Sequence, residues 1–281
     1  MNNKKSNGKR EKDQLQKIIE HIRNNTPQGT KLKEAFFKET NERIVEIEKA
    51  AGRNNHYDLI VLTNKNNSYK VEHKGSMNYS KIKLDKPPWN TGVQFYNGDP
   101  KPFTICREYA KEWYNYLFNI YVIVNNYNIK YPIPSLDEYI HDAFRQGKNK
   151  IPFMMEFKRQ YQQNTNMYSM LEERKEFNKE FVITKDDLDI LKKEIEPIYK
   201  NIMKDKEMWL QIHGDIDNSV DKIDIKWTKG MKKIPDIKVI SILTKSPDIT
   251  FYCDCDHTFG FNVHLRWGYG QGFSNLRIDF K

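Results

Sequence analysis

Two short apolar segments in the first third of the chain constrain its fold more than any other feature. Residues 57–62 and 69–74 are rich in Tyr, Leu, Ile and Val, and a polar stretch separates them. Segments of this length and composition on either side of a polar turn are typical of neighbouring strands. We therefore expect a β-hairpin between residues 57 and 74.

The expected hairpin brings charged side chains together. Alternate residues of a strand share a face, so Glu72 and Lys74 point the same way, together with Lys70. If the turn centres on Lys65, Asp58 lies directly opposite Glu72 and within reach of the same metal ion. The sequence therefore predicts two carboxylates and a lysine at the rim of an apolar sheet.

This combination of side chains favours metal-assisted phosphate chemistry. Two carboxylates in close approach repel each other unless a cation or a proton joins them. Mg²⁺ prefers oxygen ligands, and a lysine beside it can orient or deprotonate an attacking water. The alternative is an exposed hairpin in which Glu72 pairs with Lys70 or Lys74. It is disfavoured because Asp58 opens a very apolar strand, where an unpaired acid is costly.

A helix, then a strand with Asp58, then a strand with Glu72-x-Lys74 resembles the PD-(D/E)XK nuclease superfamily, the fold of many type II restriction endonucleases. The resemblance implies that Asp58 and Glu72 bind Mg²⁺ and that the backbone carbonyl of His73 is a further metal ligand. It also implies that Lys74 positions the attacking water. One departure from the pattern is Tyr57, which stands before Asp58 where the motif has proline.

Two further residues are candidates for the same site. Helical spacing predicts a helix over residues 30–51, and members of the superfamily often add a glutamate from the preceding helix. Among Glu42, Glu46 and Glu48, we favour Glu48 because it lies beside the apolar stripe, although all three could be solvated surface acids. Gln94 lies in a glycine-flanked segment that could contact a phosphate or the catalytic water, or could be a strand edge.

The periodicity changes along the chain. Helical patterns dominate up to about residue 204, and alternating patterns with turn signals follow from residue 208. We expect an α/β fold, α+β overall, with a restriction-endonuclease-like mixed central sheet flanked by helices and a C-terminal antiparallel β-rich part. The expected domains are a basic arm and helix (1–29), a nuclease core (30–130), a helical insertion (131–205) and a β-rich part (206–281).

The charge of the chain favours a polyanionic partner. The formal net charge is +9, although an AT-biased genome would also give a lysine-rich composition. A loop from 266 to 277 interleaves arginines, aromatics and amides that suit base edges, or else it is a glycine-rich hairpin packing its aromatics. The candidate DNA-contacting residues are Lys81, Lys83, Arg266, Tyr269, Gln271, Asn275 and Arg277.

Several function classes find no support in the sequence. No apolar run reaches the roughly 18 residues of a membrane span. Three cysteines do not form a disulfide framework, which favours an intracellular, cytoplasmic location. Nucleophile-elbow, phosphate-loop and dinucleotide-binding motifs are not found.

The sequence thus predicts a Mg²⁺-dependent double-stranded DNA endonuclease of type II restriction character. In-line attack by water on the phosphorus would leave a 5′ phosphate. Cutting both strands of a palindromic site requires two active sites, so a homodimer is expected. The alternatives are a structure-specific or repair nuclease of the same superfamily, and a non-catalytic nucleic-acid-binding protein in which the Asp/Glu/Lys trio is coincidental.

Overall fold

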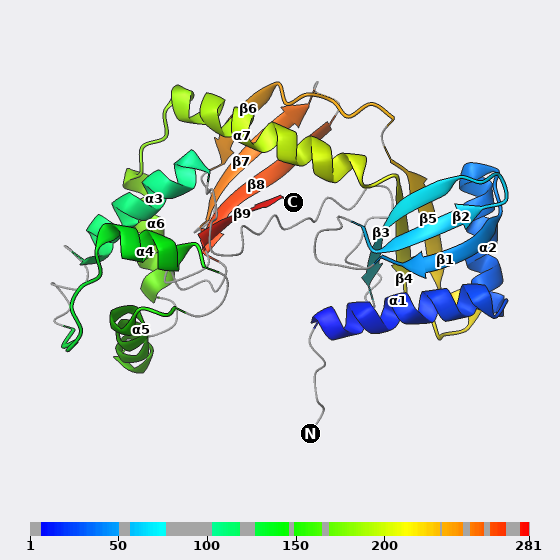
Figure 1. The fold of residues 1–281 in the computed structure, drawn as a ribbon, viewed down its shortest axis with the longest axis horizontal. Coiled ribbons are helices and arrows are strands. Elements are labelled where there is room, and N and C mark those ends of the chain that lie inside the picture. Colours follow the sequence, from blue (N-terminus) through cyan, green and yellow to red (C-terminus); the bar gives the residue numbers. More distant parts are fainter. Residues whose placement is uncertain are drawn as a thin grey trace. The chain divides into compact units, whose positions relative to one another are not determined.

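The chain forms two units, each built around its own β-sheet, in a computed structural model (Figure 1). The first unit comprises Met1–Pro88 and Ile198–Ile234, and the second comprises Trp89–Pro197 and Pro235–Lys281. The structure describes residues 7–50, 57–76, 103–118, 127–145, 149–164, 169–230, 232–243, 248–255, 259–267 and 276–280. Within these residues the fold is mixed α/β, with one mixed and one antiparallel sheet, which confirms the predicted class at this coarse level.

A five-stranded mixed sheet is the centre of the first unit. Its strands occur in the order β1-β2-β3-β4-β5, and neighbours are antiparallel except for β3 and β4, which are parallel. The elements of this unit are α1 (Asn7–Arg23), α2 (Pro27–Thr40), β1 (Ile44–Lys49), β2 (Leu59–Thr63), β3 (Ser68–Ser76), β4 (Met208–His213) and β5 (Asp224–Lys229). Strands from both ends of the chain therefore meet at the β3–β4 pairing.

The first unit differs from the predicted domains in two ways. The helix α1, expected in a separate N-terminal arm, packs into the core of this unit. Strands β4 and β5, expected in the C-terminal part, extend the sheet that begins with β1. The predicted boundaries at residues 29 and 205 therefore do not coincide with the limits of the observed units.

The second helix ends earlier than predicted. Thr26 caps it by accepting a hydrogen bond from the Gly29 amide, and Asn41 ends it in the left-handed conformation, with φ 59°. Residues 44–49 then form β1, whose β-branched residues pair with β2. The prediction of one helix over 30–51 is therefore wrong in its second half, and Glu48 lies on a strand.

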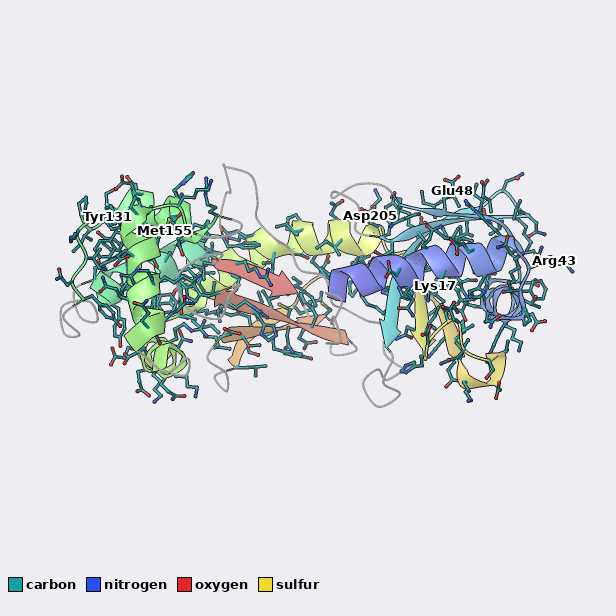
Figure 2. The ribbon with its side chains drawn as sticks, turned by 90° about the horizontal axis from the view of Figure 1, so that it is seen from below. Lys17, Arg43, Glu48, Tyr131, Met155 and Asp205 are labelled. Atoms are coloured by element: carbon teal, nitrogen blue, oxygen red, sulfur yellow. The ribbon has the colours of Figure 1, made fainter. Side chains whose placement is uncertain are left out.

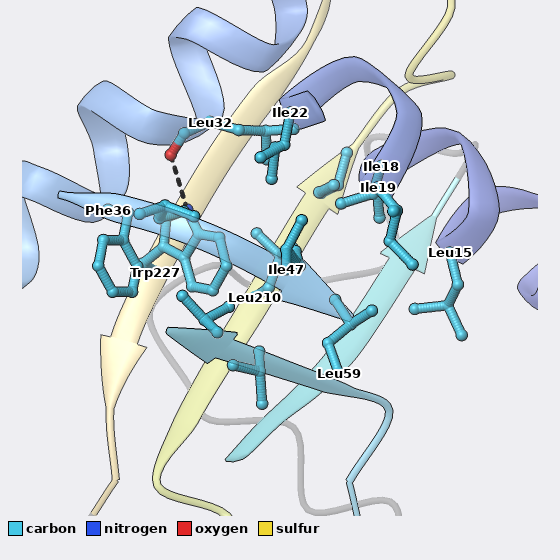
Figure 3. Packing of buried hydrophobic residues seen from close by; sticks show 14 of the residues in the cluster. Leu15, Ile18, Ile19, Ile22, Leu32, Phe36, Ile47, Leu59, Leu210 and Trp227 are labelled. Atoms are coloured by element: carbon cyan, nitrogen blue, oxygen red, sulfur yellow. Dashed lines mark hydrogen bonds between the residues drawn. The ribbon is translucent and has the colours of Figure 1, made fainter. Parts of the chain in front are cut away.

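Helices α1 and α2 cover one face of the sheet (Figure 3). The Trp227 indole of β5 lies edge-on to Phe36 of α2, with ring centroids 5.1 Å apart. Its Nε1–H donates to the Leu32 carbonyl at 3.1 Å. The apolar residues of this core are Leu15, Ile18, Ile19, Ile22, Leu32, Phe36, Ile44, Ile47, Leu59, Val61, Val71, Met208, Leu210, Ile212, Ile216, Ile223 and Trp227.

The turn between β2 and β3 is fixed by a buried acid. Glu42 accepts hydrogen bonds from the Thr63 hydroxyl at 2.6 Å, the Asn67 amide at 2.8 Å and the Tyr69 hydroxyl at 3.1 Å. The Thr63 bond is the largest of the causes that hold the pKa of Glu42 below its usual value. Glu42, one of the three candidate glutamates for the site, therefore stabilises the β2–β3 turn and its register.

The second unit combines helices with the antiparallel sheet β6-β7-β8-β9. Its elements are α3 (Thr104–Asn115), α4 (Leu136–Ala143), α5 (Pro152–Asn164), α6 (Ser169–Glu180), the first part of α7 (Lys185–Lys204), β6 (Val239–Leu243), β7 (Ile249–Cys255), β8 (Phe259–Trp267) and β9 (Leu276–Phe280). The aromatic helix α3 belongs to the core of this unit, because Trp113 is fully buried beside Phe177. No helix among the described residues has the length and hydropathy needed to span a membrane.

Candidate active site

The β2–β3 pairing brings the two predicted acids together. The register of β2 and β3 runs as far as Leu59 opposite Val71, and the Asp58 N–H donates to the Val71 carbonyl at 2.8 Å. The Asp58 carboxylate accepts the backbone N–H of His73 at 2.8 Å, which ties this end of β2 to β3. The expected turn centre at Lys65 is the one observed.

Glu72 and Lys74 share the face of the sheet that points away from α1 and α2. Val71 is fully buried in the core that α1 and α2 cover. Successive residues of a strand point to opposite faces, so Glu72, the next residue of β3, points to the other face of the sheet. The Lys74 ammonium lies 2.7 Å from Glu72 Oε1. Both side chains are largely buried, with 23% of Lys74 and 8% of Glu72 exposed. Glu72 and Lys74 are therefore not fully solvated surface charges.

A second lysine reaches the same carboxylate. The ammonium of Lys206, from the segment between α7 and β4, lies 3.3 Å from Glu72 Oε2, and its side chain is only 2% exposed. Burial lowers the pKa of Lys206, while the charges of Glu72 and Asp58 act in the opposite direction. Sequence reasoning missed this residue because a lysine between Asp205 and Glu207 reads as part of a solvated charged linker.

A buried amide stands beside Lys74 on the neighbouring strand. Gln211 of β4 is the register partner of Lys74 across the parallel pairing and is almost completely buried. Residues paired in register point to the same face, so Gln211 shares the face of the trio. Its signal in the sequence was a polar residue between Leu210 and Ile212, in the middle of an apolar strand.

His73 serves the site through its backbone. Its imidazole points into the helix-covered face and is almost completely buried, and neither ring nitrogen has a hydrogen-bond partner within the described residues. The His73 N–H points toward β2, where it donates to Asp58. In an antiparallel pair the N–H and C=O of one residue point toward the same neighbouring strand. The His73 carbonyl therefore faces the side on which Asp58 lies.

The burial of His73 predicts acid lability. Desolvation, assisted by the charge of Lys74, lowers the pKa of His73 from 6.5 to about 3. Between pH 6.5 and about 3, His73 is protonated in the unfolded state and neutral in the native state. The free energy of unfolding therefore falls as the pH is lowered through this range. Relative to His73→Leu, the free energy of unfolding of the wild type should fall by about 1.4 kcal/mol per pH unit below the unfolded pKa.

Urea denaturation at a series of pH values measures this difference. Replacement of the exposed His141 by Leu is the matched control. Parallel curves for the wild type and His73→Leu would contradict the assignment of a buried neutral imidazole.

Glu48 does not complete a three-acid cluster. It lies exposed on β1, opposite Ile60 (Figure 2). Among the described residues, no three or more His, Cys, Asp or Glu side chains are grouped so that they could hold a metal. Glu48 therefore has no observed link to the Asp58–Glu72 pair beyond sharing the sheet.

Several predicted contacts lie outside the residues that the structure describes. These are Gln94, Lys81, Lys83, Tyr269, Gln271 and Asn275. Arg266 and Arg277 are described. They face each other across β8 and β9 in the second unit, and both are partly buried.

The Arg266–Arg277 pair lies near a third, buried arginine. Arg174 of α6 lies 3.7 Å from the Asp248 carboxylate and is 2% exposed. Burial is the main cause that lowers the pKa of Arg174, and the charge of Arg266 adds to it.

The donor set at the first site suits a hard cation. Asp58, Glu72 and the His73 carbonyl offer oxygen atoms, and Mg²⁺ is commonly held by one or two carboxylates while it keeps several waters. Structural zinc instead requires four ligands, mostly Cys and His, which these residues do not supply. The residues present therefore fit Mg²⁺.

Comparisons with known proteins do not assign the chain to a family. No protein-family model matches it, and no curated protein matches it with significance.

Proposed function

We propose that this protein is a Mg²⁺-dependent endonuclease of the PD-(D/E)XK type that hydrolyses DNA phosphodiesters. The observation that carries the proposal is the position of the Asp58 carboxylate on the His73 N–H, next to Glu72 on β3, with Lys74 ion-paired to Glu72 on the same strand. These residue types in this arrangement suit metal-assisted attack on a phosphate.

The surrounding architecture supports the proposal. Helix α2 precedes the strands, β2 begins directly after Asp58, and β3 carries Glu72 and Lys74. The sheet is mixed, and α1 and α2 cover one of its faces. This order of elements, with β1 inserted between α2 and β2, supports the resemblance.

Each residue has a distinct role in the proposed reaction. Asp58, Glu72 and the His73 carbonyl would hold the metal, which supplies Lewis-acid stabilisation of the charge on the phosphate and the leaving oxygen. The Lys74 ammonium, 2.7 Å from Glu72, would orient the attacking water and stabilise negative charge on the phosphate. Gln211, beside Lys74, would replace Gln94 as the amide near the water.

The proposed substrate is double-stranded DNA. The net charge of +9 favours a polyanion, and Arg266 and Arg277 offer a cationic contact in the second unit. Cleavage of both strands at a palindromic site would require a homodimer.

Incubation of the full-length protein with supercoiled plasmid tests the function directly. We expect conversion to nicked and linear forms with Mg²⁺ and no conversion with EDTA. Discrete fragments on prolonged digestion would indicate sequence-specific restriction, whereas cutting confined to a cruciform would indicate a structure-specific nuclease. DNA retention on a gel without any cleavage would contradict the proposal and would favour a non-catalytic nucleic-acid-binding protein.

A further inference from the structure

Lysines contact both carboxylate oxygens of Glu72. Lys74 lies 2.7 Å from Oε1, and Lys206 lies 3.3 Å from Oε2. The four formal charges of Asp58, Glu72, Lys74 and Lys206 cancel. A buried cluster that is already neutral gains less from an added divalent cation than a pair of unpaired acids would.

The position of Lys206 is fixed by its two neighbours. Asp205 Oδ1 accepts a bond from the Lys70 ammonium at 2.8 Å, and Glu207 Oε2 accepts one from the Lys70 backbone N–H at 2.7 Å. Lys70 is two residues before Glu72 on β3. The segment is therefore fastened to β3 on both sides of Lys206, which places its ammonium over Glu72.

The backbone of the same segment is also anchored. The Lys206 N–H donates to the Met203 carbonyl at 3.1 Å, which closes the end of α7. The Gly230 N–H donates to the Glu207 carbonyl at 2.7 Å, which joins the segment to the end of β5. The fold therefore fixes the backbone of Lys206 beside Glu72, and Lys206 is not a freely moving surface side chain.

We propose that Lys206 is a built-in counter-cation whose ammonium a divalent metal must displace from Glu72 before the site is loaded. This inference rests on the proposed function, because it concerns the same metal site. Unlike the proposed function, this inference gives Lys206 a regulatory role. Lys74 belongs to the chemistry, and Lys206 sets the metal concentration at which the chemistry becomes available.

Replacement of Lys206 tests this part without any measurement of cleavage. Isothermal titration of the full-length protein with Mg²⁺ and with Ca²⁺, in the absence of DNA, gives the dissociation constant. Lys206→Met should bind either ion about tenfold more tightly than the wild type, because one competing positive charge is removed from the Glu72 carboxylate. Lys206→Arg retains the charge and should bind as weakly as the wild type.

Two further variants complete the design. Lys204→Met removes the same charge from an exposed position at the end of α7, and its metal affinity should match that of the wild type. Circular dichroism checks the fold of each variant. Lys206→Gln, which is neutral but polar, should show the same tightening and serves if the methionine variant does not fold.

The outcomes separate the two proposals. If the wild type binds metal and neither neutral variant binds more tightly, Lys206 is no counter-cation and this inference fails while the metal site stands. If neither the wild type nor the neutral variants bind Mg²⁺ or Ca²⁺, and Glu72→Gln behaves identically, the metal-dependent function fails as well.

Discussion

Replacement of Lys74 by Gln is expected to slow Mg²⁺-dependent plasmid cleavage by about 10²–10³-fold, the range seen when one preorganised charge-stabilising group is removed. The ammonium of Lys74 is held against Glu72 by a 2.7 Å ion pair and is mostly buried, so its loss removes positive charge at a fixed position in the proposed site. The rate constant for the first nick, measured with protein in excess over plasmid, reports the step directly.

Asp58→Asn should be at least as damaging for a different reason. The amide oxygen can still accept the His73 N–H, so the hairpin is preserved, but the negative charge that would hold the metal is gone. We therefore expect a loss of cleavage with an unchanged circular dichroism spectrum. Excess Mg²⁺ should recover part of the activity of Asp58→Asn and none of that of Lys74→Gln.

Lys204→Gln is the charge-matched control for Lys74→Gln. Lys204 is exposed at the end of α7 and loses the same charge away from the site. Its cleavage rate should stay within about threefold of the wild type, since an exposed surface charge contributes little. Equal rates for wild type, Lys74→Gln and Asp58→Asn would refute the assignment of the site.

The β2–β3 hairpin and its register could be predicted because the information is local. A hairpin with one turn fixes its own register, and the buried alternation of Leu59 and Val61 fixes which face is polar. Two strands and a turn are contained in residues that follow one another in the sequence. The prediction needed no knowledge of the rest of the chain.

Lys206 and Gln211 could not be predicted by the same reasoning. They reach the site through the parallel pairing of β3 with β4, and parallel strands are joined by long crossovers whose partners the sequence does not name. The run from Met208 to His213 reads as a strand, but its alternation gives no sign that it borders β3 instead of the C-terminal strands.

The error at Glu48 has a different physical origin. Residues 44–51 carry Ile44, Ile47 and Ala51 at spacings of three and four, which fit a helix, while Asn41 can end one in the left-handed conformation. Pairing with β2 decided between the two, because β-branched residues are favoured at the edge of an existing sheet. Tertiary contacts thus overrode a short helical pattern.

Trp227→Ala should destabilise the first unit by about 3–5 kcal/mol, the range for truncation of a large buried aromatic. The indole is 3% exposed, packs edge-on against Phe36 and donates its N–H to the Leu32 carbonyl. The substitution leaves a cavity between α2 and β5 and an unsatisfied carbonyl, and both add to the lost transfer free energy. Urea denaturation followed by far-ultraviolet circular dichroism measures the loss.

Trp227→Phe separates packing from hydrogen bonding at this position. It keeps a ring against Phe36 but loses the donor to Leu32, so a smaller loss of about 1–2 kcal/mol is expected. Because β5 borders β4, which carries Gln211 beside Lys74, partial unfolding of this edge would also loosen the site. Cleavage by Trp227→Ala should therefore fail at a lower temperature than cleavage by the wild type, in step with its unfolding. A loss below 1 kcal/mol for Trp227→Ala would contradict the packing of α2 on β5 described above.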